Sequence, residues 1–242
     1  MVNARQLNWK IRFDVMSTGG LYEAYRKRHI PGITGVILAG GESRRMGRTK
    51  ALLPYQGGRL IEAIYRQLSE LFDEVIVVTN RPELYAFLPC RKVPDLYPGR
   101  GVLAGIQGGL HHSRFPRIFV TACDMPHLNS GLIRRLAALM GENAALVPAS
   151  DGGLEPLHAF YDKAALPAIN AALASGVLRI VELFDRLPVR IVSAAEVATL
   201  DPTFASFRNI NTPDDYCRLR DRDDTCDTDT DHNDTMMANA TS

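Results

Sequence analysis

Short apolar runs alternate with longer amphipathic segments over residues 34–149 of this 242-residue chain. The pattern predicts strands at residues 34–39, 74–79, 91–93, 117–122 and 144–149, and helices at residues 59–71, 82–88 and 130–140. Strands that alternate with helices in this way are typical of βαβ units. The run 75–78 is continuous and β-branched, as expected for a strand covered on both faces. The sequence therefore predicts one α/β domain with a mostly parallel, doubly wound sheet.

The two ends of the chain do not share this pattern. Residues 1–32 are mixed in character and are predicted to be an N-terminal extension, either flexible or included by an early start codon. Residues 220–242 are rich in Asp, Thr and Asn with almost nothing to bury, so they are predicted to be a disordered acidic tail. The tail lacks the turn glycine and distal glutamate of an EF-hand calcium loop. The predicted domain spans residues 33–219.

Charge and cysteine content narrow the choice of partner. The formal net charge of +1 gives no reason to expect binding of nucleic acid. No apolar run approaches the roughly 20 residues that a membrane-spanning helix needs, so no membrane association is expected. The four cysteines form no C-x-x-C pair, and free thiols suit a reducing cytoplasm. We expect a cytoplasmic protein whose partner is small and anionic.

Polar or glycine-rich residues follow each predicted strand. Gly40 and Gly41 follow the first strand, Asn80 follows the second, and Asp95 and Asp124 follow the next two. In open α/β sheets, ligands bind outside the carboxyl ends of the strands. The sequence therefore predicts that these groups share one edge of the sheet.

The segment after the first strand is the most informative. Gly40 and Gly41 allow a tight turn whose N–H groups can bind phosphate oxygens, and four cations follow at positions 44, 45, 48 and 50. The spacing fits neither the P-loop nor the G-x-G-x-x-G dinucleotide pattern. The alternative is a glycine-rich turn with solvated arginines, but such a turn requires neither four cations nor this spacing. A polyphosphate site is the preferred interpretation.

Asp124 is the strongest candidate for catalysis. A carboxylate at a strand end beside a phosphate loop is a natural ligand for Mg²⁺, which is usually held by one or two carboxylates plus substrate phosphates. The alternative role is an N-cap, but Asn129 and Ser130 lie closer to the helix that follows. Asp95 is a weaker candidate, because Asp-x-x-Pro-Gly is also good turn material and the glycines at 99, 101 and 105 form a second predicted loop.

Three other positions are less decisive. Asn80 suits the reading of a base or ribose and is equally common in turns, so both interpretations stay open. His158, in a predicted return strand over residues 155–161, is interpreted as a hydrogen-bonded structural residue. Asn209 and Asn211 alternate in an extended segment, so both side chains point to one face. The helix after them is predicted to begin with Thr212 as N-cap and a proline at N1.

Residues 38–50 resemble the nucleotidyltransferase signature L-A-G-G-x-S-x-R-M-G-x-x-K, with every fixed position filled. This signature is accompanied by Asp95 and the Pro-Gly-Arg-Gly that follows it, by Ala-Cys-Asp-Met-Pro at 122–126 and by Asn-Ile-Asn-Thr-Pro at 209–213. With this ordered set of motifs, the chain is similar to molybdenum cofactor guanylyltransferases over residues 34 to about 219. The resemblance implies a three-layer Rossmann-like nucleotidyltransferase fold. It also implies transfer of GMP from GTP to the phosphate of the molybdopterin cofactor, with release of pyrophosphate.

The resemblance also assigns residues. The implied nucleotide-binding residues are Leu38, Ala39, Gly40, Gly41, Lys50, Asn80, Asp95 and Asp124. Asp124 would also hold Mg²⁺, Lys50 and Arg45 would assist catalysis, and Asn209 and Asn211 would line the pterin-cofactor side. GTP and molybdopterin cofactor are the implied substrates. A large product needs delivery, so transient contact with molybdoenzymes or cofactor chaperones is expected.

The sequence leaves alternatives open. Related cytidylyltransferases more often carry Ala-Ala-Gly where this chain has Ala39, Gly40 and Gly41, which favours GTP over CTP by one residue. Another nucleotidyltransferase, or a non-catalytic cofactor carrier, would share much of the pattern. The presence of both Lys50 and Asp124 argues for an enzyme.

Overall fold

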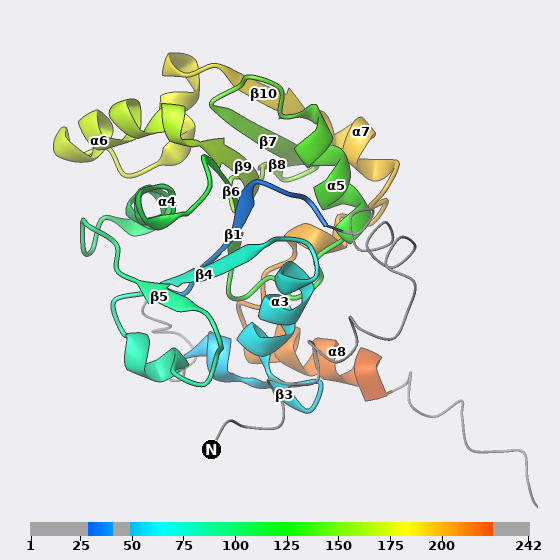
Figure 1. Ribbon diagram of the computed structural model, residues 1–242. Coiled ribbons are helices and arrows are strands. Elements are labelled where there is room, and N and C mark those ends of the chain that lie inside the picture. Colours follow the sequence, from blue (N-terminus) through cyan, green and yellow to red (C-terminus); the bar gives the residue numbers. More distant parts are fainter. Residues whose placement is uncertain (1–28, 41–48, 225–242) are drawn as a thin grey trace, which may run out of the picture.

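The computed structural model describes residues 29–40 and 49–224, and the predicted extension, the tail and residues 41–48 lie wholly or mainly outside these ranges. A central sheet is covered by α3 (Leu60–Ser69) and α5 (Ser130–Leu139) on one face and by α4 (Gly101–His112) and α6 (Leu166–Ala174) on the other (Figure 1). The predicted three-layer α/β fold is confirmed. The domain limits at 33 and 219 stay predictions. None of the described helices is long and apolar enough to cross a bilayer.

The sheet has the order β10-β7-β9-β6-β1-β4-β5, with the short β8 paired to β7. Its strands are β1 (Ile33–Leu38), β4 (Glu74–Val78), β5 (Arg91–Val93), β6 (Arg117–Ala122), β7 (Ala145–Ser150), β8 (Gly153–Leu154), β9 (His158–Asp162) and β10 (Val189–Val192). The neighbours β6, β1, β4 and β5 are mutually parallel, whereas β9 runs antiparallel to both β6 and β7. The sheet is therefore mostly parallel, as predicted.

Most predicted bounds agree with the structure within one or two residues, with three exceptions. Residues 82–88 form only the 3₁₀ turn η2 (Pro82–Tyr85), because two prolines bracket the segment and leave too few backbone bonds for an α-helix. The return strand β9 starts three residues later than predicted, because Pro156 cannot donate to a ladder. Gly105 lies inside α4 and not in a loop. A Cβ at Gly105 would lie 3.2 Å from the Leu38 side chain, so the glycine lets α4 pack closely on β1.

Several short elements complete the chain and were not predicted. They are the hairpin β2 (Pro54–Tyr55) and β3 (Gly58–Arg59), the helix α7 (Ala194–Ala198), and the 3₁₀ turns η1 (Lys50–Leu52), η3 (Lys163–Ala165), η4 (Ile180–Arg186) and η5 (Ala205–Phe207). Each is too short to give a periodic pattern, so sequence periodicity cannot reveal it.

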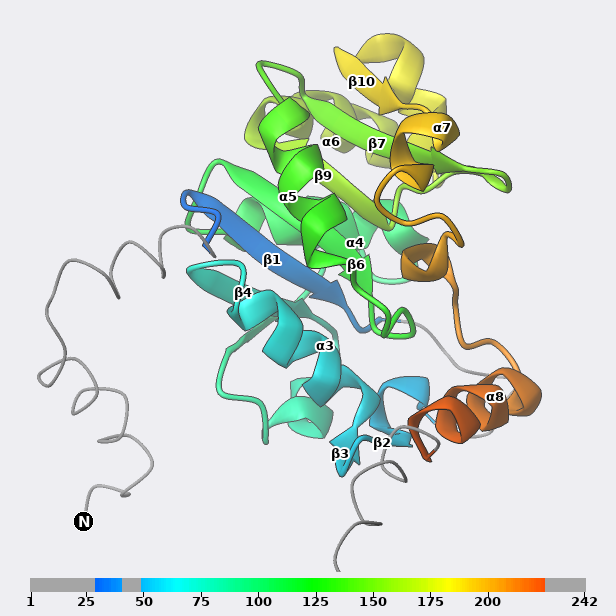
Figure 2. The ribbon, with the colours of Figure 1, turned by 90° about the vertical axis from the view of Figure 1, so that its right-hand side faces the viewer.

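A small third apolar cluster joins the C-terminal helix α8 (Pro213–Asp224) to the hairpin and α3. It contains Tyr55, Leu60, Ala63, Ile210 and Leu219. Figure 2 shows α8 beside β2 and β3. The predicted cap is confirmed, since Thr212 Oγ1 accepts from Asp215 N at 3.1 Å and the Asp215 carboxylate accepts from Thr212 N at 2.8 Å. The cluster thereby places the C-terminal segment against the segment that follows the first strand.

His158 begins β9 and is fully buried among aromatic side chains. The expected hydrogen bonds are not found: neither ring nitrogen has a partner within the described ranges. The ring instead meets Phe119 and Phe207 edge to face. Burial lowers the pKa of His158 to about 3, although Asp201 acts in the opposite direction.

This buried imidazole should make the protein sensitive to acid. The ordinary pKa of histidine is 6.5, so between that pH and about 3 the unfolded chain binds a proton that the folded chain does not. Stability should therefore fall as the pH is lowered through this window. We expect His158→Phe to remove up to about 1.4 kcal/mol per pH unit from the slope of unfolding free energy against pH. Urea unfolding between about pH 4 and pH 7 measures this, and an unchanged slope would contradict it.

Candidate active site

Backbone register brings four strand ends into one row. Leu38 at the end of β1 pairs with Ala122 of β6 on one side and with Val78 of β4 on the other, and Val78 pairs with Val93 of β5. The residues that follow these positions therefore share one edge. The chain passes from β1 to β4 and β5 on one side and returns to β6 on the other. The gap between β1 and β6 is thus the topological switch point, where such sheets bind ligands.

A cavity of about 280 Å³ opens at this switch point. Its lining includes six of the predicted nucleotide-binding residues: Leu38, Ala39, Gly40, Lys50, Asp95 and Asp124. The first turn of α4, at Gly101 and Val102, also lines it, so a helix N-terminus faces the space where an anion would lie. Gly41 and Arg45 lie outside the described residues.

Asn80 is not in the lining and instead orients Asp95. Its Nδ2 donates to Asp95 Oδ2 at 2.9 Å, and its Oδ1 accepts from Asp95 N at 3.2 Å. The other carboxylate oxygen, Asp95 Oδ1, is buried without a partner in the described parts of the chain. A fixed carboxylate with one unused oxygen is suited to accept hydrogen bonds from a ribose or a base.

Lys50 joins the metal candidate to the C-terminal segment. Its Nζ lies 3.4 Å from Asp124 Oδ2 and 2.8 Å from Asn211 Oδ1. The Lys50 and Asp124 side chains are only 15% and 20% exposed. An ammonium and a carboxylate are thus held together in a partly desolvated cavity, where each charge acts more strongly than in bulk water.

The segment that carries Asn209 and Asn211 is anchored to Asp124. Ile210 N donates to the Asp124 carbonyl at 2.9 Å, and Asn209 lines the cavity. The structure therefore brings both asparagines to the same side of the site, as the alternate spacing predicts. The contact between Lys50 and Asn211 spans 161 positions and has no signal in the sequence.

The lining also contains residues that were not predicted, among them Tyr85 and Cys123. Tyr85 is buried, and its hydroxyl donates weakly to the Ala39 carbonyl at 3.4 Å. Cys123 precedes Asp124, and burial raises the pKa of its thiol to about 12. Cys123 therefore stays protonated near neutral pH and is not a nucleophile.

In the described parts of the chain, no three His, Cys, Asp or Glu side chains gather in a way that could hold a metal ion. The protein would supply the Asp124 carboxylate, and substrate phosphates would supply further oxygens. This donor set fits Mg²⁺, which keeps much of its shell as water and phosphate.

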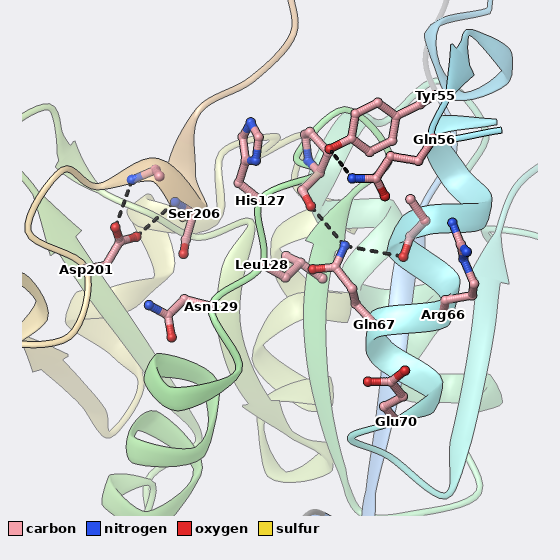
Figure 3. Close-up of a pocket in the computed structure, with 13 residues that line it drawn as sticks. Tyr55, Gln56, Arg66, Gln67, Glu70, His127, Leu128, Asn129, Asp201 and Ser206 are labelled. Carbon is pink, nitrogen blue, oxygen red and sulfur yellow. Dashed lines mark hydrogen bonds between the residues drawn. The ribbon is translucent and has the colours of Figure 1, made fainter. Parts of the chain in front are cut away.

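A second, more open cleft of about 590 Å³ lies between α3 and the segment leading to α5 (Figure 3). Its polar groups are largely bonded to one another or to the backbone. Gln67 Nε2 donates to the Pro126 carbonyl at 2.9 Å, and the Asp201 carboxylate accepts from Ala205 N and Ser206 N at 3.0 and 2.9 Å. Because its described lining includes neither a lysine nor the strand-end carboxylates, the smaller cavity is the candidate active site.

The family model of the MobA-like NTP transferase domain matches residues 35–190, which is more than half of the chain. The chain belongs to the MobA-like NTP transferase family. Membership of this MobA-like family makes the protein a nucleotidyltransferase and confirms the resemblance found in residues 38–50. The matched region contains the whole cavity edge from β1 to β6, whereas Asn209 and Asn211 lie beyond it.

Individual MobA-like proteins agree with this assignment. The probable molybdenum cofactor guanylyltransferase of Pelotomaculum thermopropionicum is 36% identical over 187 residues, covering 77% of this chain and 91% of that protein. The molybdenum cofactor guanylyltransferase of Desulfosudis oleivorans is 34% identical over 185 residues, covering 76% and 92%. The crystal structure of molybdopterin-guanine dinucleotide biosynthesis protein A from Archaeoglobus fulgidus aligns with a TM-score of 0.70 at 29% identity, covering 79% of this chain and 99% of that one.

Gly40, in the cavity lining, and Gly108, which lies against the backbone of Pro94 and Asp95, should respond differently to alanine. A Cβ at Gly40 would meet nothing within 4 Å, so Gly40→Ala should leave the unfolding free energy within about 0.5 kcal/mol of wild type. Its methyl group would nevertheless occupy space where a phosphate approaches the backbone. We expect weaker binding of a nucleoside triphosphate, measured by calorimetry.

Gly108→Ala is the matched comparison. A Cβ there would lie 3.0 Å from the Pro94 carbonyl oxygen and 3.2 Å from Asp95 Cα, and backbone atoms cannot swing aside. We expect a loss of about 1–3 kcal/mol in stability together with weaker nucleotide binding through a displaced Asp95. Wild-type nucleotide affinity in Gly40→Ala would show that phosphate does not approach the backbone closely at Gly40.

Proposed function

We propose that this protein transfers GMP from GTP to the terminal phosphate of the molybdopterin cofactor and releases pyrophosphate. The observation that carries the proposal is the pairing of Lys50 with Asp124 at the switch point of a MobA-like sheet. Support for the substrates comes from relatives at 34–36% identity that are named molybdenum cofactor guanylyltransferases. The cytoplasmic location expected from the cysteines stays a prediction.

The nucleotide side of the site would use backbone and carboxylate groups. The amides at Gly40 and Gly41 would bind phosphate oxygens, with the N-terminus of α4 facing the same space. The Asn80–Asp95 pair would bind the ribose or the guanine, because Asp95 Oδ1 has an unused acceptor position. Asp124 would hold Mg²⁺, which when bound neutralises charge on the phosphate oxygens.

Lys50 would stabilise the charge that develops on the α-phosphate and on the departing pyrophosphate. It already lies between Asp124 and Asn211, so little rearrangement is needed for it to meet a phosphate. Arg45 would assist from the neighbouring loop. Asn209 and Asn211 would face the pterin cofactor, because both lie on the Asp124 side of the cavity.

The chemistry needs no strong general base. The attacking phosphate has a second pKa of about 6 and is therefore largely ionised near neutral pH. Its oxygen forms a bond to the α-phosphorus of GTP while the bond to the β-phosphate oxygen breaks. Catalysis would then depend on in-line positioning and on charge neutralisation, which Lys50 would provide together with the Mg²⁺ that Asp124 would hold.

The test is pyrophosphate release by the purified protein with Mg²⁺ and molybdopterin cofactor, comparing GTP with CTP, ATP and UTP. Release with GTP alone is the expected result. Release with CTP would overturn the choice of base. Binding of GTP without release would instead indicate another acceptor or a carrier role.

Two substitutions should lower turnover strongly without unfolding the protein. We expect Lys50→Ala and Asp124→Asn each to lower kcat by about 10²–10³, the usual effect of removing one charge-stabilising group. Asp162→Asn and Lys163→Ala are matched controls, because Asp162 is also paired, with Arg117 at 3.2 Å, and both residues lie at the opposite edge of the sheet. Near-normal kcat in either site variant would exclude that residue from the proposed role.

A further inference from the structure

His158 is held between two aromatic rings that belong to different parts of the chain. Its ring centroid lies 5.0 Å from that of Phe119 in β6 and 5.1 Å from that of Phe207 in η5, with interplanar angles of 87° and 79°. His158 is fully buried and Phe207 is 8% exposed. The imidazole therefore packs the 3₁₀ turn η5 onto the sheet.

The turn that meets His158 is tightly built. The Asp201 carboxylate accepts two backbone hydrogen bonds, from Ala205 N and Ser206 N, as Figure 3 shows. Phe204 adopts a left-handed conformation with φ of 51°, which is unfavourable for a bulky residue and persists only where surrounding contacts fix it. The turn is thus rigid within itself, and its position on the sheet depends on what it packs against.

Buried polar groups from both sides lie near this ring contact. Thr121 stands opposite His158 in the β6–β9 register. Thr121 Oγ1, Ser206 Oγ and both His158 nitrogens have no hydrogen-bond partner in the described ranges. These polar atoms make no hydrogen bond in the described ranges, so β9 and η5 are joined by apolar and ring contacts. The His158 ring lies against Phe207, and Phe160 of β9 belongs to the same apolar cluster as Phe207. A phenylalanine ring in place of the His158 imidazole would leave fewer polar atoms buried without a described partner.

The acceptor side of the proposed site lies within the four residues that follow η5. Ile210 N donates to the Asp124 carbonyl at 2.9 Å, and Asn211 Oδ1 accepts from Lys50 Nζ at 2.8 Å. Only Arg208 and Asn209 separate Phe207 from Ile210, so the position of Phe207 constrains where this segment meets Asp124. The part of the nucleotide side formed by Asn80 and Asp95, by contrast, follows β4 and β5, which His158 does not join.

We propose that His158 is a positioning residue for the acceptor substrate: by wedging its ring against Phe207, it fixes the segment from Phe207 to Asn211 on Asp124. The inference rests on the proposed function for its effect on turnover. It predicts that loss of the ring disturbs the acceptor side of the site more than it disturbs GTP binding.

The test combines hydrogen exchange with kinetics on the full-length protein. His158→Ala should speed exchange of the Ile210 amide and raise the KM for molybdopterin cofactor roughly tenfold, the equivalent of two lost aromatic contacts. The Kd for Mg-GTP should rise by a smaller factor than this KM, because Asn80 and Asp95 stay in place. Phe207→Ala should act in the same way, and the double variant should be no worse than either single one, because both remove the same contact.

Conservative and control variants separate positioning from general stability. His158→Phe keeps a ring against Phe119 and Phe207 and should restore slow exchange at Ile210 and the low KM. Tyr161→Phe is the control on the same strand: Tyr161 is fully buried and donates to the Pro156 carbonyl at 2.8 Å, but it faces the opposite helical layer. It should alter neither readout.

Each outcome is decisive. Unchanged exchange at Ile210 in His158→Ala, additive effects in the double variant, or failure of His158→Phe to rescue would overturn the proposal. Equal weakening of Mg-GTP and acceptor binding would do the same. If the wild type releases no pyrophosphate, the proposed function fails, but the exchange of Ile210 still tests the positioning role.

Discussion

The backbone register of β1 with its two neighbours is the constraint on which the candidate site depends. Leu38 is paired in register with both Ala122 and Val78, so the groups after β1, β4 and β6 emerge side by side. A slip of one residue would turn the side chains of β1 to the opposite face and misalign this edge. Burial on both faces of β1 makes such a slip costly, because Val36 and Ile37 fill the two different helical layers.

The same strands show which parts of the fold and of the candidate site could be predicted from the sequence. Buried parallel strands are continuous apolar runs, so β1, β4 and β6 and the polar residues after them could be predicted from the order of apolar and polar residues along the chain. The contact of Lys50 with Asn211 could not, because it depends on α8 folding back against the β2–β3 hairpin through a cluster of only a few side chains. The lack of hydrogen-bond partners for the His158 nitrogens within the described ranges was also unpredictable, since the sequence does not show which buried groups find partners.

The charges of the site are arranged so that one cation serves two neighbours. Lys50 meets a carboxylate on one side and a neutral amide on the other. The amide oxygen of Asn211 is neutral, so it orients the ammonium without adding negative charge to that of Asp124. A second carboxylate in that position would hold Lys50 more strongly and repel the substrate.

The antiparallel strand β9 divides the functional edge of the sheet into two parts that differ in how well they tolerate changes in loop length. Because β7 ends and β9 begins at this edge, residues 151–157 cross it as a hairpin connection that contains the short strand β8 and brings Leu157 to the cavity lining. On the nucleotide side, each strand end is tied to the start of a different crossover, and a change in length would disturb the packing of a helix. The hairpin loop carries no such helix. Insertions and deletions there could reshape the acceptor side over evolution while the triphosphate side stayed as it is, which would let one nucleotide-binding half be combined with many acceptors.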